Sequence, residues 1–338
     1  MSTIRDVAKL ANVSTATVSR VMNNDTKYKI TDATKKRVWD AIRVLNYTMP
    51  AKPPKRKHEP VSQSTSHKIG CILSVTKKKY NDPYFMSILA GIERRLEEKG
   101  CTISFIKTGA ELVDRATLAA AFKEPVAGML LMETLNRDLY DYVRGHVPHM
   151  VGIDTMREDI DNVGYDHYQA GLLAARHLIN KGHKKIGFIG GSGDSPDLMN
   201  SRRYQGYYIA MSEAGLQVNP KWTLNCEWDE DLCAAQVDAL CKSGDYPTAI
   251  MAASDLMAIV AMNSLFRNGL SVPHDVAIAS ISNIDMSKYT TPPLTTVHIP
   301  TEEIGVVAAD MLLSRINGND LLPQRIILPT SLLERNSV

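Results

Sequence analysis

A short stretch near the start of the sequence, VSTATVSRVMN (13–23), has apolar residues at helical spacing and an outer face of hydroxyls, one methyl and one guanidinium. The Arg20 guanidinium can donate two hydrogen bonds to O6 and N7 of a guanine, and the Ala16 methyl fits the methyl of a thymine. Hydroxyl side chains can bond phosphates or base edges. We therefore expect DNA contacts from Ser14, Thr15, Ala16, Thr17, Ser19, Arg20 and Asn23.

The distribution of charge favours this interpretation over a plainer one, the solvated face of an ordinary helical bundle. Of the 39 Lys and Arg in the chain, 13 lie in residues 1–60, against only 5 of the 37 Asp and Glu. A basic segment attached to a mildly acidic body is typical of a protein whose first part contacts a polyanion.

A second set of polar side chains follows the apolar segments that we expect to be strands. Ligands bind at the carboxyl ends of strands in open parallel sheets. Asp, Asn and Arg side chains near an aromatic ring suit a polyol, and the candidates are Asn81, Asp82, Tyr84, Asp154, Arg203, Ser254, Ser282 and Asn283. Trp222 or Trp228 could supply the ring. Asp255 is equally suited to capping a helix, and Tyr84 and Phe85 to a core or a dimer interface.

Patterns for catalysis and metal binding are not found in the sequence. GGSGD (190–194) lacks the last glycine of G-x-S-x-G, and the nine histidines show no H-E-x-x-H spacing. The five cysteines include no CxxC pair, which favours reduced thiols in a cytoplasmic protein. We expect no enzyme, cofactor or metal site, and neither a signal peptide nor a membrane span.

The elements that position these residues fall into three parts. Thr3, Ser14 and Thr31 can each cap a short helix, so three helices are expected within the first 45 residues. Residues 48–67, TMPAKPPKRKHEPVSQSTSH, contain four prolines and almost no apolar residue, which predicts a linker.

Beyond the linker, apolar segments alternate with amphipathic ones. Strands are expected at 69–75, 101–106, 126–132, 148–155, 184–191, 248–254 and 276–282, and helices at 86–100, 168–182, 202–215 and 255–269. This alternation predicts parallel sheets covered by helices on both faces. The elements are too many for one small sheet, so we expect two doubly wound subdomains with a cleft between them.

The first part of the chain also carries a resemblance. TIRDVAKLANVSTATVSRVMNN and ITDATKKRVWDAIRVLNY resemble the head of the lactose-repressor (LacI/GalR) family, and GHKKIGFIGG, YPTAIMAASD and YTTPPLTTV are similar to segments of its core. NDPYF, SNID and PPLTTV resemble the members that control a β-galactosidase operon. The resemblance assigns base-reading positions to Thr15, Ala16 and Arg20, and backbone-holding positions to Ser14, Thr17, Ser19 and Asn23. It also implies that Arg203 and Asp154 contact an effector.

Two features depart from the family. Members usually carry a hinge helix with a leucine that wedges into the minor groove, but this linker has no leucine. Either Met49 replaces it or, as we favour, the hinge works differently and basic residues within 52–57 contact phosphates. A solvated charge run fits the linker equally well. Ser282 and Asn283 stand where the family commonly has two aspartates.

The predicted fold class is an all-α helix-turn-helix head plus an α/β periplasmic-binding-protein-like core of two doubly wound parallel-sheet subdomains. The expected domains are a head (1–47), a proline-rich basic hinge or linker (48–67) and an effector-binding and dimerisation core (68–338). Within the core we place one subdomain at about 68–162 and 295–320, and the other at about 163–294 and 321–335.

The predicted function is repression of transcription by a cytoplasmic homodimer that binds pseudo-palindromic operator DNA. A small effector, expected to be a sugar or galactoside, controls the operator affinity from the cleft. A purine-type corepressor is one alternative. A cytosolic sugar-binding protein or carbohydrate enzyme with a non-functional head is the other.

Overall fold

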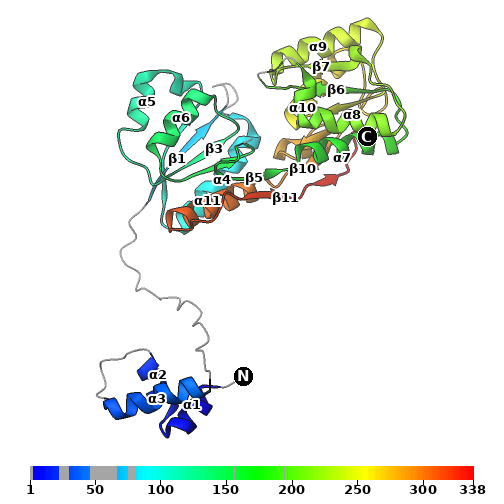
Figure 1. The fold of residues 1–338 in the computed structure, drawn as a ribbon. Coiled ribbons are helices and arrows are strands. Elements are labelled where there is room, and N and C mark those ends of the chain that lie inside the picture. Colours follow the sequence, from blue (N-terminus) through cyan, green and yellow to red (C-terminus); the bar gives the residue numbers. More distant parts are fainter. Residues whose placement is uncertain are drawn as a thin grey trace. The chain divides into compact units, whose positions relative to one another are not determined.

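The computed structural model describes residues 3–22, 30–45, 67–74, 81–155, 157–193, 195 and 197–338. It divides into two units, a head within residues 1–63 and a core within residues 64–338 (Figure 1). Asn23 and residues 48–66 of the expected linker lie outside the described residues, so the predictions made for them stay predictions.

The described part of the head contains the three expected helices, α1 (Ile4–Ala11), α2 (Thr15–Met22) and α3 (Asp32–Val44). The first begins with a capping box, in which the backbone N–H and hydroxyl of Thr3 donate to Asp6 Oδ2 at 2.8 and 2.7 Å. Thr31 Oγ1 accepts a bond from the N–H of Thr34 at 3.4 Å and caps the third. The buried apolar core between the helices consists of Val7, Ala8, Ala11, Val18, Val21, Val38 and Ala41.

The first sheet of the core has six parallel strands in the order β11-β5-β4-β3-β1-β2. Its strands are β1 (Lys68–Leu73), β2 (Thr102–Thr108), β3 (Gly128–Met132), β4 (Met150–Ile153), β5 (Asp161–Tyr165) and β11 (Arg325–Leu328). Helices cover both faces, as predicted from the nearly continuous apolar strands. They are α4 (Pro83–Glu98), α5 (Arg115–Ala121), α6 (Arg137–His146) and α11 (Thr301–Ile316).

The second sheet also has six strands, in the order β12-β10-β9-β8-β6-β7, of which β12 is antiparallel to its neighbour. Its strands are β6 (Ile186–Gly190), β7 (Thr223–Asn225), β8 (Ala249–Ala252), β9 (Ala277–Ser282), β10 (Thr295–His298) and β12 (Ser331–Leu333). The helices are α7 (His167–Asn180), α8 (Arg202–Glu213), α9 (Glu230–Ser243) and α10 (Asp255–Arg267).

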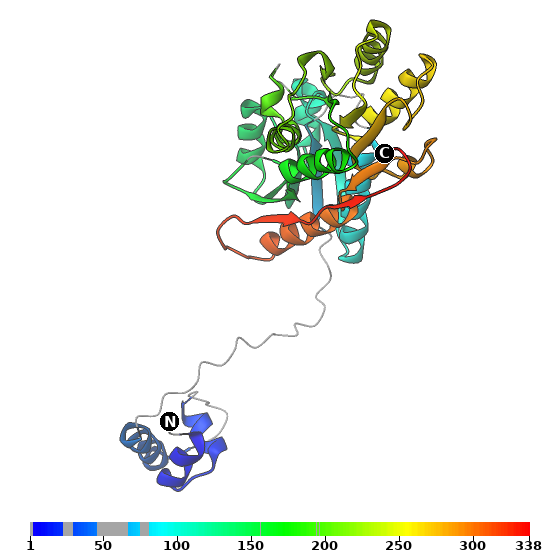
Figure 2. The same ribbon diagram turned by 90° about the vertical axis from the view of Figure 1, so that its right-hand side faces the viewer.

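The chain passes between the two sheets three times, after β5, after β10 and after β11 (Figures 1 and 2). Two of the expected subdomain boundaries are therefore wrong. Strand β10 belongs to the second sheet, because it pairs with β9, Thr295 opposite Ala279. Strand β11 belongs to the first sheet, because it pairs with β5, Arg325 opposite Asn162.

A buried carboxylate joins the neighbouring strands β9 and β10 of the second sheet. Asp255, the first residue of α10, is fully buried and accepts hydrogen bonds from the Ser280 and Thr296 hydroxyls at 2.6 Å each. It also accepts one from the backbone N–H of Ile284 at 2.8 Å. Burial raises its pKa, and the three bonds oppose that rise. Asp255 thus joins two strands to a turn, and the neighbouring Ser254 caps the helix instead.

Replacing Asp255 with alanine is expected to lower the free energy of unfolding by about 2–4 kcal/mol, because three buried donors lose their acceptor. The midpoint of urea unfolding of the core measures the loss. The control is Asp285→Ala, since that carboxylate is exposed on a short turn and pairs with Lys288 of the same turn. Equal midpoints for the two variants would contradict this role for Asp255.

Candidate functional site

The head presents a helix, a tight turn and a second helix. Helix α1 ends at Asn12, whose left-handed backbone (φ 52°) turns the chain. Ser14 then caps α2, because its Oγ accepts a hydrogen bond from the N–H of Thr17 at 3.1 Å. The predicted helix boundaries around this turn are confirmed.

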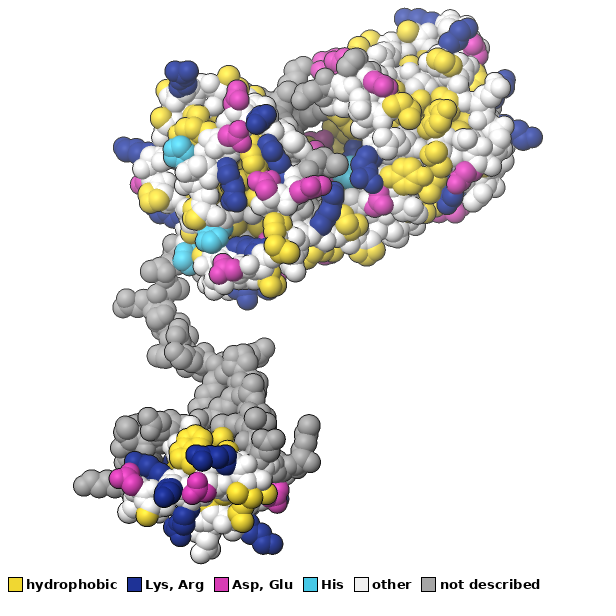
Figure 3. Space-filling model, in the orientation of Figure 1, with side chains coloured by type: hydrophobic (Ala, Val, Ile, Leu, Met, Phe, Trp, Pro, Cys, Tyr) yellow, Lys and Arg dark blue, Asp and Glu magenta, His cyan; other side chains and the backbone are white. Residues whose placement is uncertain are grey.

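The face of α2 that the sequence assigns to DNA points outward. Ser14, Thr15 and Ala16 are exposed, whereas Val18 and Val21 are buried against the other helices. The remaining described candidates, Thr17, Ser19 and Arg20, are half-buried. No acidic residue lies in the first turn of α2, and Lys and Arg side chains are prominent on the visible face of the head (Figure 3). The surface therefore combines donors, a methyl group and positive charge.

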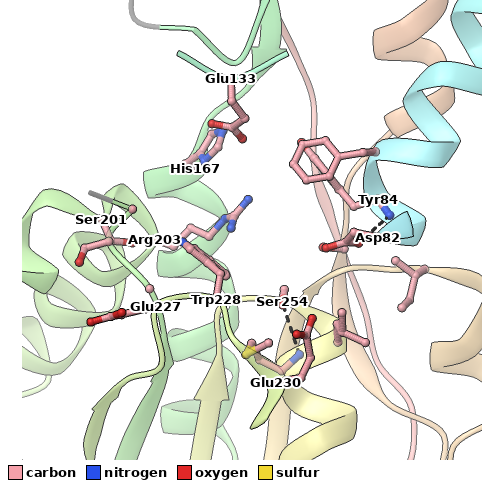
Figure 4. A pocket seen from close by; sticks show the side chains of 18 of the residues that line it. Asp82, Tyr84, Glu133, His167, Ser201, Arg203, Glu227, Trp228, Glu230 and Ser254 are labelled. Carbon is pink, nitrogen blue, oxygen red and sulfur yellow. Dashed lines mark hydrogen bonds between the residues drawn. The ribbon is translucent and has the colours of Figure 1, made fainter. Parts of the chain in front are cut away.

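The core contains a cavity of about 410 Å³ with walls from both subdomains. Figure 3 shows a hollow between the two halves of the core, and Figure 4 shows the side chains within it. The cavity is lined by Ser74, Asp82, Tyr84, Phe85, Glu133, His167, Gly191, Ser192, Gly193, Ser201, Arg203, Glu227, Trp228, Glu230, Ser254, Leu256, Met257, Ser282 and Ile284.

Strand ends place several of these residues together. Ser74 follows β1, Glu133 follows β3, Gly191 follows β6, and Ser282 is the last residue of β9. Five helices also begin at the cavity, namely α4, α7, α8, α9 and α10. This agrees with the expectation that ligand-binding groups gather at the carboxyl edges of parallel strands.

Five of the eight predicted effector residues line the cavity: Asp82, Tyr84, Arg203, Ser254 and Ser282. Phe85 and Trp228 line it as well.

The other candidates lie elsewhere. Asn81 is exposed and is not among the lining residues. The Trp222 indole N–H donates to the carbonyl of Asp245 at 3.0 Å, so Trp222 is a buried structural residue. Asn283 and Asp154 are held by internal partners and are not among the lining residues, so the structure does not place them with the other candidates.

Asn283 has a left-handed backbone (φ 58°) and is not among the residues that line the cavity. Its side-chain amide lies 3.1 Å from His298 Nδ1, and its Oδ1 accepts a bond from Arg335 at 2.7 Å. His298 ends the strand that precedes the second passage between the sheets. Asn283 therefore contacts the end of strand β10 and Arg335, while Ser282 beside it lines the cavity.

Arg203 places a permanent positive charge in the cavity (Figure 4). Its Nε donates to the Tyr165 hydroxyl at 3.0 Å, and a second guanidinium N–H bonds the same oxygen. Its Cζ lies 5.2 Å from the centre of the Trp228 ring. Burial opposes the charge, but Tyr165, Tyr84 and Glu133 outweigh this and raise the pKa of Arg203.

Asp154 is buried behind the cavity wall. Its Oδ2 accepts a bond from the Tyr84 hydroxyl at 2.8 Å, and its Oδ1 lies 3.1 Å from His167 Nε2. The backbone is left-handed there (φ 53°), and Oδ1 occupies the space that a Cβ at Gly164 would fill. Burial opposes ionisation, but the bonds from His167 and Tyr84 lower the pKa of Asp154 below its usual value. Each oxygen of Asp154 thus already has an internal partner, and Asp154 is not among the residues that line the cavity.

The sequence analysis missed several lining residues, among them Glu133, His167, Glu227 and Glu230. Glu133 follows the expected strand 126–132, so the rule of strand ends could have found it. Glu227 has a left-handed backbone (φ 49°), which no pattern in the sequence predicts. Among the described residues, no group of three or more His, Cys, Asp or Glu side chains is arranged to hold a metal ion.

Together, the head and the cavity define a class: proteins with a helix-turn-helix domain and a periplasmic-binding-protein-like core. A family model for "Bacterial regulatory proteins, lacI family" matches residues 3–49, and one for "Periplasmic binding protein-like domain" matches residues 175–338. The chain is 34% identical over 325 residues to the HTH-type transcriptional repressor PurR of Aliivibrio salmonicida (strain LFI1238), covering 94% of this chain and 92% of that protein. The chain belongs to the lacI family.

Further relatives agree with this assignment. The HTH-type transcriptional repressor PurR of Actinobacillus pleuropneumoniae serotype 3 (strain JL03) is 35% identical over 344 residues, which cover 100% of this chain and 98% of that protein. A structure of the transcriptional regulator CelR–cellobiose complex has a TM-score of 0.72 at 28% identity and covers 100% of both chains. The chain is thus a DNA-binding transcriptional repressor. No described helix has the length and apolar character required to span a membrane.

Proposed function

We propose that this repressor is controlled by a carbohydrate bound in the cavity. The observation that carries the proposal is the set of carboxylates near an aromatic ring and a cation: Asp82, Glu133 and Glu230 line the same space as Trp228 and Arg203 (Figure 4). Sugar hydroxyls are donors that need acceptors, and ionised carboxylates only accept. A volume of about 410 Å³ lies in the range of small-molecule sites.

A nucleobase is the second candidate, because the relatives at 34% and 35% identity are PurR repressors. A flat base could stack on Trp228 and accept from Arg203. It offers fewer donors than a sugar with many hydroxyls, however, so it makes less use of the carboxylates as acceptors. The acceptor-rich wall therefore favours the polyhydroxylated ligand.

The ligand acts by its contacts with both subdomains. Glu133 lies at the end of a strand of the first sheet, whereas Arg203 and Trp228 belong to the second subdomain. A ligand that bonds all three stabilises one arrangement of the subdomains over another and thereby changes operator affinity. The coupling is reciprocal, so operator DNA changes ligand affinity by the same factor.

The repressor works as a homodimer in the cytoplasm, where its operator lies. One short helix such as α2 contacts too few base pairs to specify a unique site, and two copies read two half-sites of a pseudo-palindrome. The fold neighbours include a lac repressor dimer bound to operator and the anti-inducer ONPF, with a TM-score of 0.66 at 23% identity. That likeness concerns the fold alone.

Titration of a labelled operator complex with galactosides, glucosides, cellobiose, ribose, guanine and hypoxanthine tests the proposal. We expect one sugar to change the operator affinity at least about fivefold, the lower end of allosteric couplings. It should also change the fluorescence of Trp228, which Trp228→Phe removes and the control Trp222→Phe retains. A response to purines with none to sugars would contradict the carbohydrate assignment and favour the second candidate.

A further inference from the structure

One cavity side chain has a ring nitrogen that the fold leaves available. His167 is the first residue of α7, just after the chain passes from β5 into the second subdomain. Its ring lines the cavity, and its side chain is 24% exposed. Nε2 lies 3.1 Å from Asp154 Oδ1, and no hydrogen-bond partner for Nδ1 is found among the described residues.

The buried carboxylate decides which nitrogen carries the proton. The pKa of Asp154 is lowered, so its carboxylate is ionised at neutral pH and can only accept. Its other oxygen already accepts from the Tyr84 hydroxyl. Nε2 of His167 must therefore be the protonated nitrogen that donates to Oδ1, which leaves a lone pair on Nδ1 when the ring is neutral.

Burial keeps that ring neutral. Burial lowers the pKa of His167, Asp154 opposes the shift, and Arg203 and Arg202 add to it. Glu133, at the end of β3, lies near the ring in the cavity wall (Figure 4). Near pH 7 the imidazole that lines the cavity is therefore uncharged, and its Nδ1 is a hydrogen-bond acceptor.

The ring is also fixed in orientation. The Tyr165 ring stacks on it, with centroids 4.1 Å apart and planes 11° from parallel. The Tyr165 hydroxyl is in turn held by Arg203. Asp154 and Tyr84 belong to the first subdomain and His167 to the second, so the His167–Asp154 bond joins the two at a passage of the chain.

We propose that His167 is a specificity-determining residue, whose Nδ1 accepts a hydrogen bond from the bound ligand, and that Asp154 is the positioning residue that holds it. This rests on the proposed control by a ligand. The ligand group is an O–H or ring N–H donor, as found in a sugar or a nucleobase. A compound that offers only an acceptor there binds poorly, because two lone pairs then face each other.

A measurement without ligand tests the positioning role. In the full chain labelled with ¹⁵N-histidine at pH 7.5, the ring nitrogens of His167 should show the Nε2–H tautomer, with the signal assigned by its loss in His167→Gln. Asp154→Asn supplies an amide N–H that can donate to Nε2, so it should shift the ring toward the Nδ1–H tautomer. The control is His183→Gln, since His183 lies outside the cavity with Nδ1 3.2 Å from Thr248 Oγ1. An Nδ1–H ring or an imidazolium in the unaltered chain overturns the proposal.

A second measurement tests specificity with the compound that the operator titration identifies. His167→Gln retains an amide N–H for Asp154 but lacks the ring acceptor, so ligand affinity should fall about ten- to a hundredfold. Wild-type ligand affinity should also fall as the pH drops through the lowered pKa of His167, whereas His167→Gln should show no such step.

The two proposals fail in distinguishable ways. Unchanged ligand affinity in His167→Gln overturns the role of His167 but leaves ligand control standing. If none of the tested sugars and purines binds, control by those compounds fails, and the tautomer in the ligand-free chain alone decides whether Asp154 positions His167.

Discussion

Replacing Arg203 with alanine is expected to weaken ligand binding about thirtyfold or more while operator binding persists. The guanidinium is a permanent cation in the cavity, and it donates to Tyr165 and faces the ring of Trp228. Truncating one partner of a desolvated charged contact costs about 2–5 kcal/mol, which is roughly 30- to 5,000-fold in affinity. Isothermal titration gives the ligand affinity, and operator anisotropy with and without ligand gives the response.

The neighbouring residue supplies the control for this variant. Arg202 is exposed and is not among the lining residues, and its guanidinium Nη2 lies 3.6 Å from Asp166 Oδ1. Arg202→Ala should retain the full response. A normal ligand response in Arg203→Ala would remove Arg203 from the binding machinery, and with it the proposed position of the ligand.

The second large effect concerns the head. In Arg20→Ala, each half-site loses a bidentate base contact worth about 1–3 kcal/mol, so a dimer on two half-sites loses about twice that. The variant should also cease to discriminate at one base pair of each half-site, while its affinity for scrambled DNA changes little. Binding to operator duplexes substituted at single positions measures both effects.

A basic residue on another helix serves as the control. Arg37 lies on α3 and donates to Thr34 Oγ1 at 3.4 Å within that helix. Its replacement with alanine should change the affinities for operator and scrambled duplex by the same factor. If Arg20→Ala behaves in that uniform way as well, Arg20 contacts the backbone and not a base.

How far the fold follows from the sequence depends on how local its signals are. The helices of the head were predicted because capping residues and apolar spacing lie within a few positions of each other. Strand β5 was missed because DNVGY begins with two polar residues. Asp161 and Asn162 are nevertheless buried, and Asp161 is paired with Arg315 at 2.6 Å. Because the two residues are 154 positions apart, no pattern near Asp161 in the sequence predicts that it is buried.

The same distinction separates the site residues that were found from those that were not. The strand-end rule located Ser254 and Ser282 because carboxyl ends of parallel strands share one edge. It also selected Asp154 and Asn283, whose side chains are held by internal partners, because the rule takes no account of such contacts. His167 could not be singled out from the sequence, since its role depends on the carboxylate of Asp154.

The most direct test of the account is the affinity of the intact chain for two duplexes at about 150 mM salt. One is selected by the protein from a random pool, and the other is its scrambled version. The account predicts at least about a thousandfold preference for the selected duplex, changed by the cavity ligand and reduced in Arg20→Ala. Equal affinities for the two duplexes, with or without ligand, would contradict it.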